Sequence, residues 1–218
     1  MRKLLSSMPA HLRRLRKDNG AVALVEFALS LPLLLLMGLG GVETANYAVT
    51  HMRVAQIAVS LADNASRAKQ DVASGMPRMR EADVNEAFTA AQLQAANLDI
   101  AENGRLILSS LEMNADGGQW IHWQRCFGDA PYISSYGVQG DGATGTSVTG
   151  MGPADRRVAA ESGFAVMFAE VVYDYQPIIF GSLIPDDPIR KIAAMYVRDD
   201  RDLSNIFNPS PAAPVRSC

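Results

Sequence analysis

The sequence predicts an α+β protein in which a single N-terminal transmembrane helix continues into an amphipathic helix that packs on a small antiparallel sheet. Three observations support this class: an apolar run at residues 21–42, apolar positions spaced three and four apart over residues 54–68, and strand-like segments after residue 105. Helices followed by strands are typical of α+β folds. The predicted organisation is a basic leader at residues 1–20, a spanning and extended helix at residues 21–72, and an α+β domain with a Pro-rich tail at residues 73–218.

The apolar run contains one charged residue, Glu26. At about 1.5 Å of rise per residue, a helix over residues 21–42 is about 33 Å long, enough to cross a hydrocarbon core of about 30 Å. A charged side chain at the centre of a membrane helix costs on the order of 2.5–3.5 kcal/mol, and the cost falls toward the interface, where Glu26 lies. Two interpretations follow: Glu26 has a partner in the membrane, or headgroups solvate it and it is merely tolerated.

The charge distribution predicts the orientation. The leader has one acid, Asp18, against the bases Arg2, Lys3, Arg13, Arg14, Arg16 and Lys17. Basic flanks stay on the cytoplasmic side of a span, so the acidic remainder should lie outside. A cleaved secretory signal is the alternative, but residues 41–46 offer no A-x-A site. The acidic domain has no basic stripe, which argues against a nucleic-acid partner.

The helix is expected to continue beyond the membrane to Gln70. Its apolar face consists of Val54, Ile57, Ala58, Leu61, Ala62, Ala65 and Ala68, with polar residues opposite. Residues 75–77 break this pattern, and a second helix is predicted at residues 81–97.

The remainder is predicted to be mainly strands and loops. Strands are expected at residues 106–108 and 119–127 around a turn at 115–118, and again at 163–175 and 192–198. Residues 137–156 are rich in Gly, Ser and Thr, which predicts a long exposed loop. Alternate residues from 165 to 175 are apolar or aromatic, and the amphipathic helix is the nearest element that could cover this strand face.

No pattern in the chain predicts catalysis or a cofactor. Residues 140–145 match G-x-G-x-x-G, but no strand precedes them and no helix follows. The histidines His11, His51 and His122 are too scattered for a metal cluster. Glu170 and Asp174 would lie about 13 Å apart on one strand, which favours a polar sheet face over an acid–base pair. We therefore expect a protein that is not an enzyme.

Cys126 and Cys218 are the two cysteines of the chain. Outside the cytoplasm, an even pair predicts a disulfide. This bridge would tie the Pro-rich tail at residues 208–214 to the strand that contains Trp120 and Trp123. Two free thiols and an intermolecular link are the alternatives.

Residues 19–36, behind a short basic leader, resemble the N-terminal segment of TadE-like proteins, the pseudopilins of the bacterial Tad (tight adherence) system that builds Flp-type pili. Residues 123–126 and 173–177 also resemble recurrent features of TadE-like ectodomains. The resemblance implies a pilin-like, single-pass protein of the bacterial inner membrane with a periplasmic domain. It also implies a role as minor pilin or assembly factor that contacts other pilins and the Tad machinery and could enter the pilus.

The resemblance further implies processing by a prepilin peptidase. The family motif is Gly, four residues, Glu and an aromatic residue; Glu26 and Phe27 match its second half, but the glycine position falls on Ala21, with Gly20 one residue earlier. Cleavage after Ala21, cleavage after Gly20 and no cleavage all remain open. Cleavage would create an α-amino cation, and Glu26 of a neighbouring subunit could pair with it.

Two classes of function are therefore expected. The first is a structural and assembly protein, for which Glu26 and Phe27 provide subunit contacts. The second is a signal-anchored periplasmic enzyme or binding module of unknown ligand, in which the Gly-rich loop and the aromatic strand form a pocket.

Overall fold

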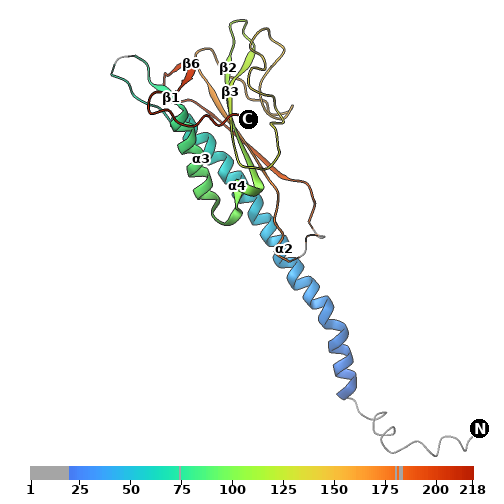
Figure 1. The fold of residues 1–218 in the computed structure, drawn as a ribbon. Coiled ribbons are helices and arrows are strands. Elements are labelled where there is room, and N and C mark those ends of the chain that lie inside the picture. Colours follow the sequence, from blue (N-terminus) through green and yellow to red (C-terminus); the bar gives the residue numbers. More distant parts are fainter. Residues whose placement is uncertain (1–19, 74, 180, 182–183) are drawn as a thin grey trace, which may run out of the picture. The chain divides into compact units, whose positions relative to one another are not determined.

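The computed structural model describes residues 20–73, 75–179, 181 and 184–218. Its long helix followed by an antiparallel sheet confirms the predicted α+β class (Figure 1). Except for Gly20, the basic leader lies outside the described residues. The elements are α2 (Gly20–Arg67), β1 (Arg78–Arg80), α3 (Glu81–Ala95), a 3-10 turn (Ala96–Leu98), α4 (Ile100–Asn103), β2 (Gly104–Met113), β3 (Gln119–Phe127), β4 (Val166–Tyr173), β5 (Ile189–Tyr196) and β6 (Asp202–Phe207).

The chain divides into two compact units. The helix–loop unit comprises Met1–Asn46 and Pro177–Ile184, and the sheet unit comprises Tyr47–Gln176 and Pro185–Cys218. Helix α2 contributes its first part to the helix–loop unit and its last part to the sheet unit. The predicted boundaries at residues 20 and 72 concern topology across a membrane and stay predictions.

The main sheet has the strand order β3-β2-β4-β5, and each neighbouring pair is antiparallel. The hairpin of β2 and β3 matches the predicted strands, although β2 extends well beyond residues 106–108. Strand β5 begins at Ile189 instead of residue 192, because Arg190 and Lys191 interrupt the apolar pattern on which the prediction rested. Strands β1 and β6 were not predicted; they are short and pair in parallel across a long sequence separation.

One face of the sheet is covered by the last part of α2 and by α3, as Figure 1 shows. The apolar stripe of α2 from Val54 to Ala65 is fully buried against residues of β2 and β4. Helix α3 adds Phe88, which is also fully buried. The amphipathic extension therefore covers the sheet as predicted, because an apolar helix stripe and an apolar strand face exclude water from each other.

The opposite face of the sheet is covered by loop segments. Met151 and Ala160 pack there with Leu111, Ile121 and Phe168, and Met151 is 0% exposed. Two backbone hydrogen bonds of 2.8 and 3.0 Å join Met151 to Val158 and hold the loop in place. The prediction of a fully exposed loop at residues 137–156 was wrong at Met151, because a sheet that is apolar on both faces needs a second cover.

Glu170 corrects the prediction of a polar sheet face. Every residue of β4 is buried, and Glu170 is 1% exposed. Its carboxylate pairs with Arg190 at 3.0 Å and accepts hydrogen bonds from the Ser134 hydroxyl and the Ser135 backbone N–H, both at 3.1 Å. These partners compensate for the lost hydration of the charge.

A β-bulge allows β3 to contribute side chains to the cores on both faces of the sheet. The pairing with β2 shifts from Ser110↔Trp123 to Leu111↔Ile121, so His122 is the extra residue. Ile121 consequently packs in the core under the loop, whereas Trp123 packs in the core under the helices. His122 stacks on Trp120 and hydrogen-bonds Glu112 at 2.9 Å, so it is a packed strand residue.

Candidate functional site

The first part of α2 presents an apolar surface whose one charged residue is Glu26. Within the described part of the chain, α2 is the one helix that has the length and composition to cross a membrane, and its most apolar stretch has a mean hydropathy of 2.3 and no buried residues. Soluble monomers rarely leave such a large apolar surface exposed. The exposed side chains are Val22, Leu24, Val25, Phe27, Leu29, Leu31, Leu33, Leu34, Leu35, Leu36, Met37, Leu39 and Val42.

The predicted processing and assembly residues lie at the beginning of this surface. Gly20 is the first residue of α2, and Ala21 follows within the helix. Glu26 is exposed about two turns further on, and the adjacent Phe27 is 60% exposed. No described residue forms a hydrogen bond or an ion pair with the Glu26 carboxylate. The Glu26 carboxylate, on an apolar helix surface, is therefore available to a group outside the described residues.

A second acid of α2, Glu43, follows immediately after the apolar run and is 0% exposed. Its carboxylate accepts hydrogen bonds from the backbone N–H groups of Ile178, at 3.2 and 3.3 Å, and of Ile179, at 2.7 Å. Bonds to a charged acceptor are stronger than neutral ones. Glu43 therefore ties the loop between β4 and β5 to α2, within the helix–loop unit.

Glu43 is not among the site residues predicted from the sequence. Two sequence features point to it: it is the first charged residue after the apolar run, and the distant segment 177–185 is unusually apolar for a loop. Only the folded structure shows that the two segments are in contact, because residues 43 and 178 are far apart along the chain.

Comparison with known families covers this same helix. Residues 21–63 match the family model of TadE-like proteins. The TadE-like segment includes the apolar surface, Glu26, Phe27 and Glu43, and it extends into the buried stripe of the sheet unit. The match covers this N-terminal segment and shows a similarity to TadE-like proteins there. No curated protein and no solved structure matches the chain.

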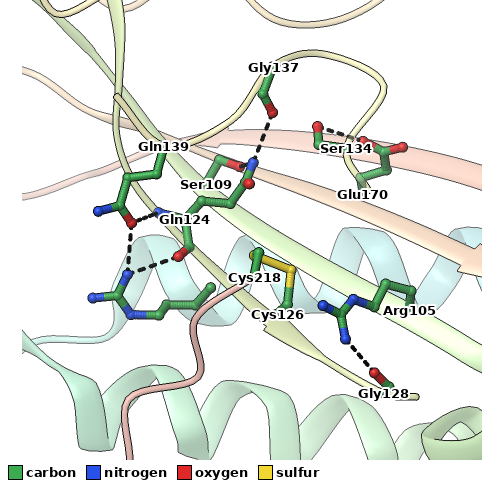
Figure 2. The surroundings of a disulfide bond; sticks show 11 residues. Arg105, Ser109, Gln124, Cys126, Gly128, Ser134, Gly137, Gln139, Glu170 and Cys218 are labelled. Carbon is green, nitrogen blue, oxygen red and sulfur yellow. Dashed lines mark hydrogen bonds between the residues drawn. A yellow bond between two sulfur atoms is a disulfide. The ribbon is translucent and has the colours of Figure 1, made fainter. Parts of the chain in front are cut away.

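The two cysteines are joined by a disulfide between the end of β3 and residue 218 (Figure 2). The tail beside the bond is also held by hydrogen bonds: the Cys126 backbone N–H donates to the Arg216 carbonyl at 2.8 Å, and the Asn85 amide donates to the Pro214 carbonyl at 2.8 Å. The guanidinium of Arg216 lies over the Phe127 ring, 5.0 Å from its centroid. The tail is thus part of the sheet unit's structure.

The residues around Cys126 in β3 are structural. Trp123 is in the main core, and Gln124 donates to the Ser109 hydroxyl at 2.9 Å (Figure 2). Arg125 is buried and contacts both carboxylate oxygens of Glu81, the first residue of α3, at 3.0 Å from its Nε. Residues 123–126 therefore connect the sheet to the core, to α3 and to the tail.

A cleft of about 390 Å³ lies beside the disulfide and is a candidate ligand site in the sheet unit. Several of its polar groups are already paired: Arg105 Nη1 donates to the Gly128 carbonyl at 2.6 Å, and the Tyr132 hydroxyl donates to Asp174. The Nε of Arg105 is buried and has no hydrogen-bond partner among the described residues. The remaining lining residues are Gln124, Ile133, Ser134, Val138, Gln139, Ser217 and Cys218. This arrangement offers a surface for binding and no activated nucleophile.

The cluster of Ser110, Glu112 and His122 does not have the geometry of a catalytic triad. Glu112 lies between Ser110 and His122, at 2.7 and 2.9 Å, so the carboxylate separates the nucleophile from the base. In a catalytic triad the histidine stands between the other two groups. Across the described ranges, no three His, Cys, Asp or Glu side chains are placed to hold a metal ion.

Proposed function

We propose that this chain is a minor pseudopilin or assembly protein of a Tad pilus, anchored in the bacterial inner membrane with its leader in the cytoplasm and its sheet unit in the periplasm. It acts in pilus biogenesis and adherence through contacts with other pilins and the Tad machinery. One observation carries the proposal: the TadE-like segment is part of a helix that is long and apolar enough to cross a membrane. Its exposed apolar surface includes the Glu26 carboxylate, which has no partner among the described residues.

Glu26 is the proposed subunit contact. Cleavage by a prepilin peptidase after Gly20 or Ala21 would leave an α-amino cation at the start of the apolar helix. In the low dielectric of the membrane, the Glu26 carboxylate of a neighbouring subunit attracts this cation strongly. The pair would hold neighbouring helices at one axial register, and the exposed Phe27 would pack beside it.

Substitution of Glu26 tests this role. We expect Glu26→Gln and Glu26→Ala to insert and to be processed like the wild type, and to reduce the number of pili at least tenfold. Glu26→Asp keeps the charge and should retain more assembly than either. Ser30→Ala, one turn further along α2, serves as the matched control, because its hydroxyl bonds only the Phe27 carbonyl of the same helix among the described residues. Normal pilus numbers in Glu26→Gln would contradict the role.

Mass spectrometry of the N-terminus of the membrane-extracted protein tests the processing step. Loss of 20 residues would place the cut after Gly20, and loss of 21 residues would place it after Ala21. An intact Met1 would show that the chain is not processed, and the proposed ion pair would then lack its cation.

The cleft beside the disulfide favours a second candidate, a signal-anchored periplasmic binding module. In that case the purified protein should keep Met1, behave as a stable monomer and contain a bound small molecule. Native mass spectrometry of the detergent-extracted protein distinguishes this outcome from a pilin that associates with other subunits.

A further inference from the structure

The geometry points to a second membrane contact: Ile178 and Ile179, in the loop between β4 and β5, lie in the lipid interface of the periplasmic leaflet, with their side chains against the acyl-chain boundary. This inference rests on the membrane anchoring in the proposed function and on no other part of it. It depends on the tie between Glu43 and the loop, on the exposure of the two isoleucines and on the depth at which α2 leaves the membrane.

The tie to Glu43 determines the depth of the loop. Glu43 is one residue beyond Val42, the last residue of the apolar run, which corresponds to about 1.5 Å of rise along the helix. The Ile178 and Ile179 backbone N–H groups lie within hydrogen-bond distance of its carboxylate. The loop backbone is therefore level with the end of the span, within the interfacial layer that adds about 5–7 Å on each side of the hydrocarbon core.

The exposed side chains suit that layer. Ile178 is 65% exposed and Ile179 is 36% exposed, whereas the apolar residues of β4, which ends at Tyr173, are all buried. The loop sequence from 177 to 185 contains no charged residue. In water, exposed isoleucines at a loop tip are unfavourable, whereas at the headgroup–acyl boundary they are removed from water.

The Glu43 contact also explains how a polar backbone can lie so close to hydrocarbon. Backbone N–H groups that lose water without gaining a partner cost free energy. The carboxylate accepts from two successive N–H groups of the loop. A buried acid at the end of the span thus satisfies the loop that enters the interface.

Depth-dependent fluorescence quenching tests this contact. The full-length protein would be reconstituted in nanodiscs of phosphatidylethanolamine and phosphatidylglycerol with brominated acyl chains, and labelled with bimane at Ile178→Cys. We expect blue-shifted emission and at least twofold stronger quenching than at Ile133→Cys. Ile133 is a matched control because it is 77% exposed and forms no hydrogen bond with α2 among the described residues. The native cysteines are joined to each other and do not compete for the label.

Two further variants separate the possible results. Leu33→Cys labels the middle of the apolar run: quenching there without quenching at Ile178 overturns the loop contact and leaves the membrane anchor intact. Absence of quenching at both positions overturns both. Glu43→Gln weakens the tie, and we expect it to lower quenching at Ile178 at least twofold and to leave Leu33 unchanged. Protection of Ile178 only when other pilins are present would show a protein contact instead of a lipid contact.

Discussion

At the scale of single residues, the sheet unit buries the carboxylates Glu81 and Glu170 and pairs each with an arginine. Arg125 reaches both oxygens of Glu81, and Arg190 pairs with Glu170, whose side chain is 1% exposed. A buried pair of this kind adds little net stability, but the loss of one partner leaves the other charge buried and alone. The Arg125–Glu81 pair joins β3 to α3, and the Arg190–Glu170 pair joins β5 to β4.

Replacement of Arg125 should show this asymmetry. We expect Arg125→Ala to lower the free energy of unfolding by about 3–5 kcal/mol, because Glu81 would remain buried without its partner. Arg67→Ala is the matched control: its pair with Asp63 is exposed, and we expect a loss of about 0–1 kcal/mol. Urea denaturation in detergent micelles, followed by tryptophan fluorescence, measures both. Equal losses would show that the buried pair has no special role.

Tyr132 shows the same principle for a neutral group. The hydrogen bond from its hydroxyl to Asp174 raises the Tyr132 pKa above its ordinary value, and burial adds to the shift. In the unfolded chain the phenol ionises near its usual pKa of about 10, so the folded state holds the proton more tightly. The stability from this bond is present below pH 10 and is lost as the pH rises toward and through the folded-state pKa.

The Tyr132→Phe variant tests this pH dependence. We expect the wild type to be more stable than the variant at pH 8, and the difference to shrink as the pH rises above 10. Absorbance of the ionised phenol at alkaline pH should show one late-titrating tyrosine fewer in the variant. A difference that grows with pH would contradict the assigned bond.

At the scale of elements, the first and last parts of α2 lie in different environments. Its first part exposes apolar side chains around the helix, whereas its last part buries one stripe, from Val54 to Ala65, under the sheet. The composition of the Gly-rich loop predicts an exposed segment, but the loop places Met151 in a second hydrophobic core. The element that would be judged most dispensable from composition thus completes the fold.

Substitution of Met151 tests how much the loop contributes to the free energy of unfolding. We expect Met151→Ala to lower the free energy of unfolding by about 2–5 kcal/mol, because truncation leaves a cavity between the loop and β4. Met113→Ala removes the same atoms from a side that is 37% exposed and should cost less than about 1 kcal/mol. Chemical denaturation of both variants provides the comparison, and similar losses would mean that the loop does not seal the sheet.

At the scale of the whole molecule, the disulfide connects positions 92 residues apart. It joins the C-terminal tail to β3, while hydrogen bonds from Asn85 and Cys126 hold the same tail to α3 and the sheet. The bond therefore restricts the unfolded chain from the end of β3 to the C-terminal tail, a segment that contains β4, β5 and β6.

Removal of the disulfide should destabilise this unit. We expect Cys126→Ser, Cys218→Ser and the double variant to lower the free energy of unfolding equally, on the order of 4 kcal/mol by the loop-entropy model. Wild-type protein in reducing agent should show the same loss, measured by denaturation under both redox conditions. Single variants that differ strongly from the double variant would show that side-chain packing, and not the bond, is responsible.

Local pattern was sufficient for part of this structure. The apolar run, the helical period that follows it, the turn beside residues 119–127 and the alternation in residues 165–175 predict α2, β3 and β4, because these patterns depend on neighbours close in sequence. The TadE-like resemblance at the beginning of α2 also depends on one continuous segment. The parallel pair of β1 and β6 was missed, because three-residue strands have no period to detect.

The sequence by itself determined the α+β class, the candidate membrane helix with Glu26 and the family of its first segment. The tertiary structure alone decided that Glu43 holds the loop at Ile178, that Arg125 pairs with Glu81 and that Met151 closes the second face of the sheet. The physical reason is the same in each case. A charge or an apolar side chain must find a partner, and residues distant in sequence supply that partner only when the chain has folded.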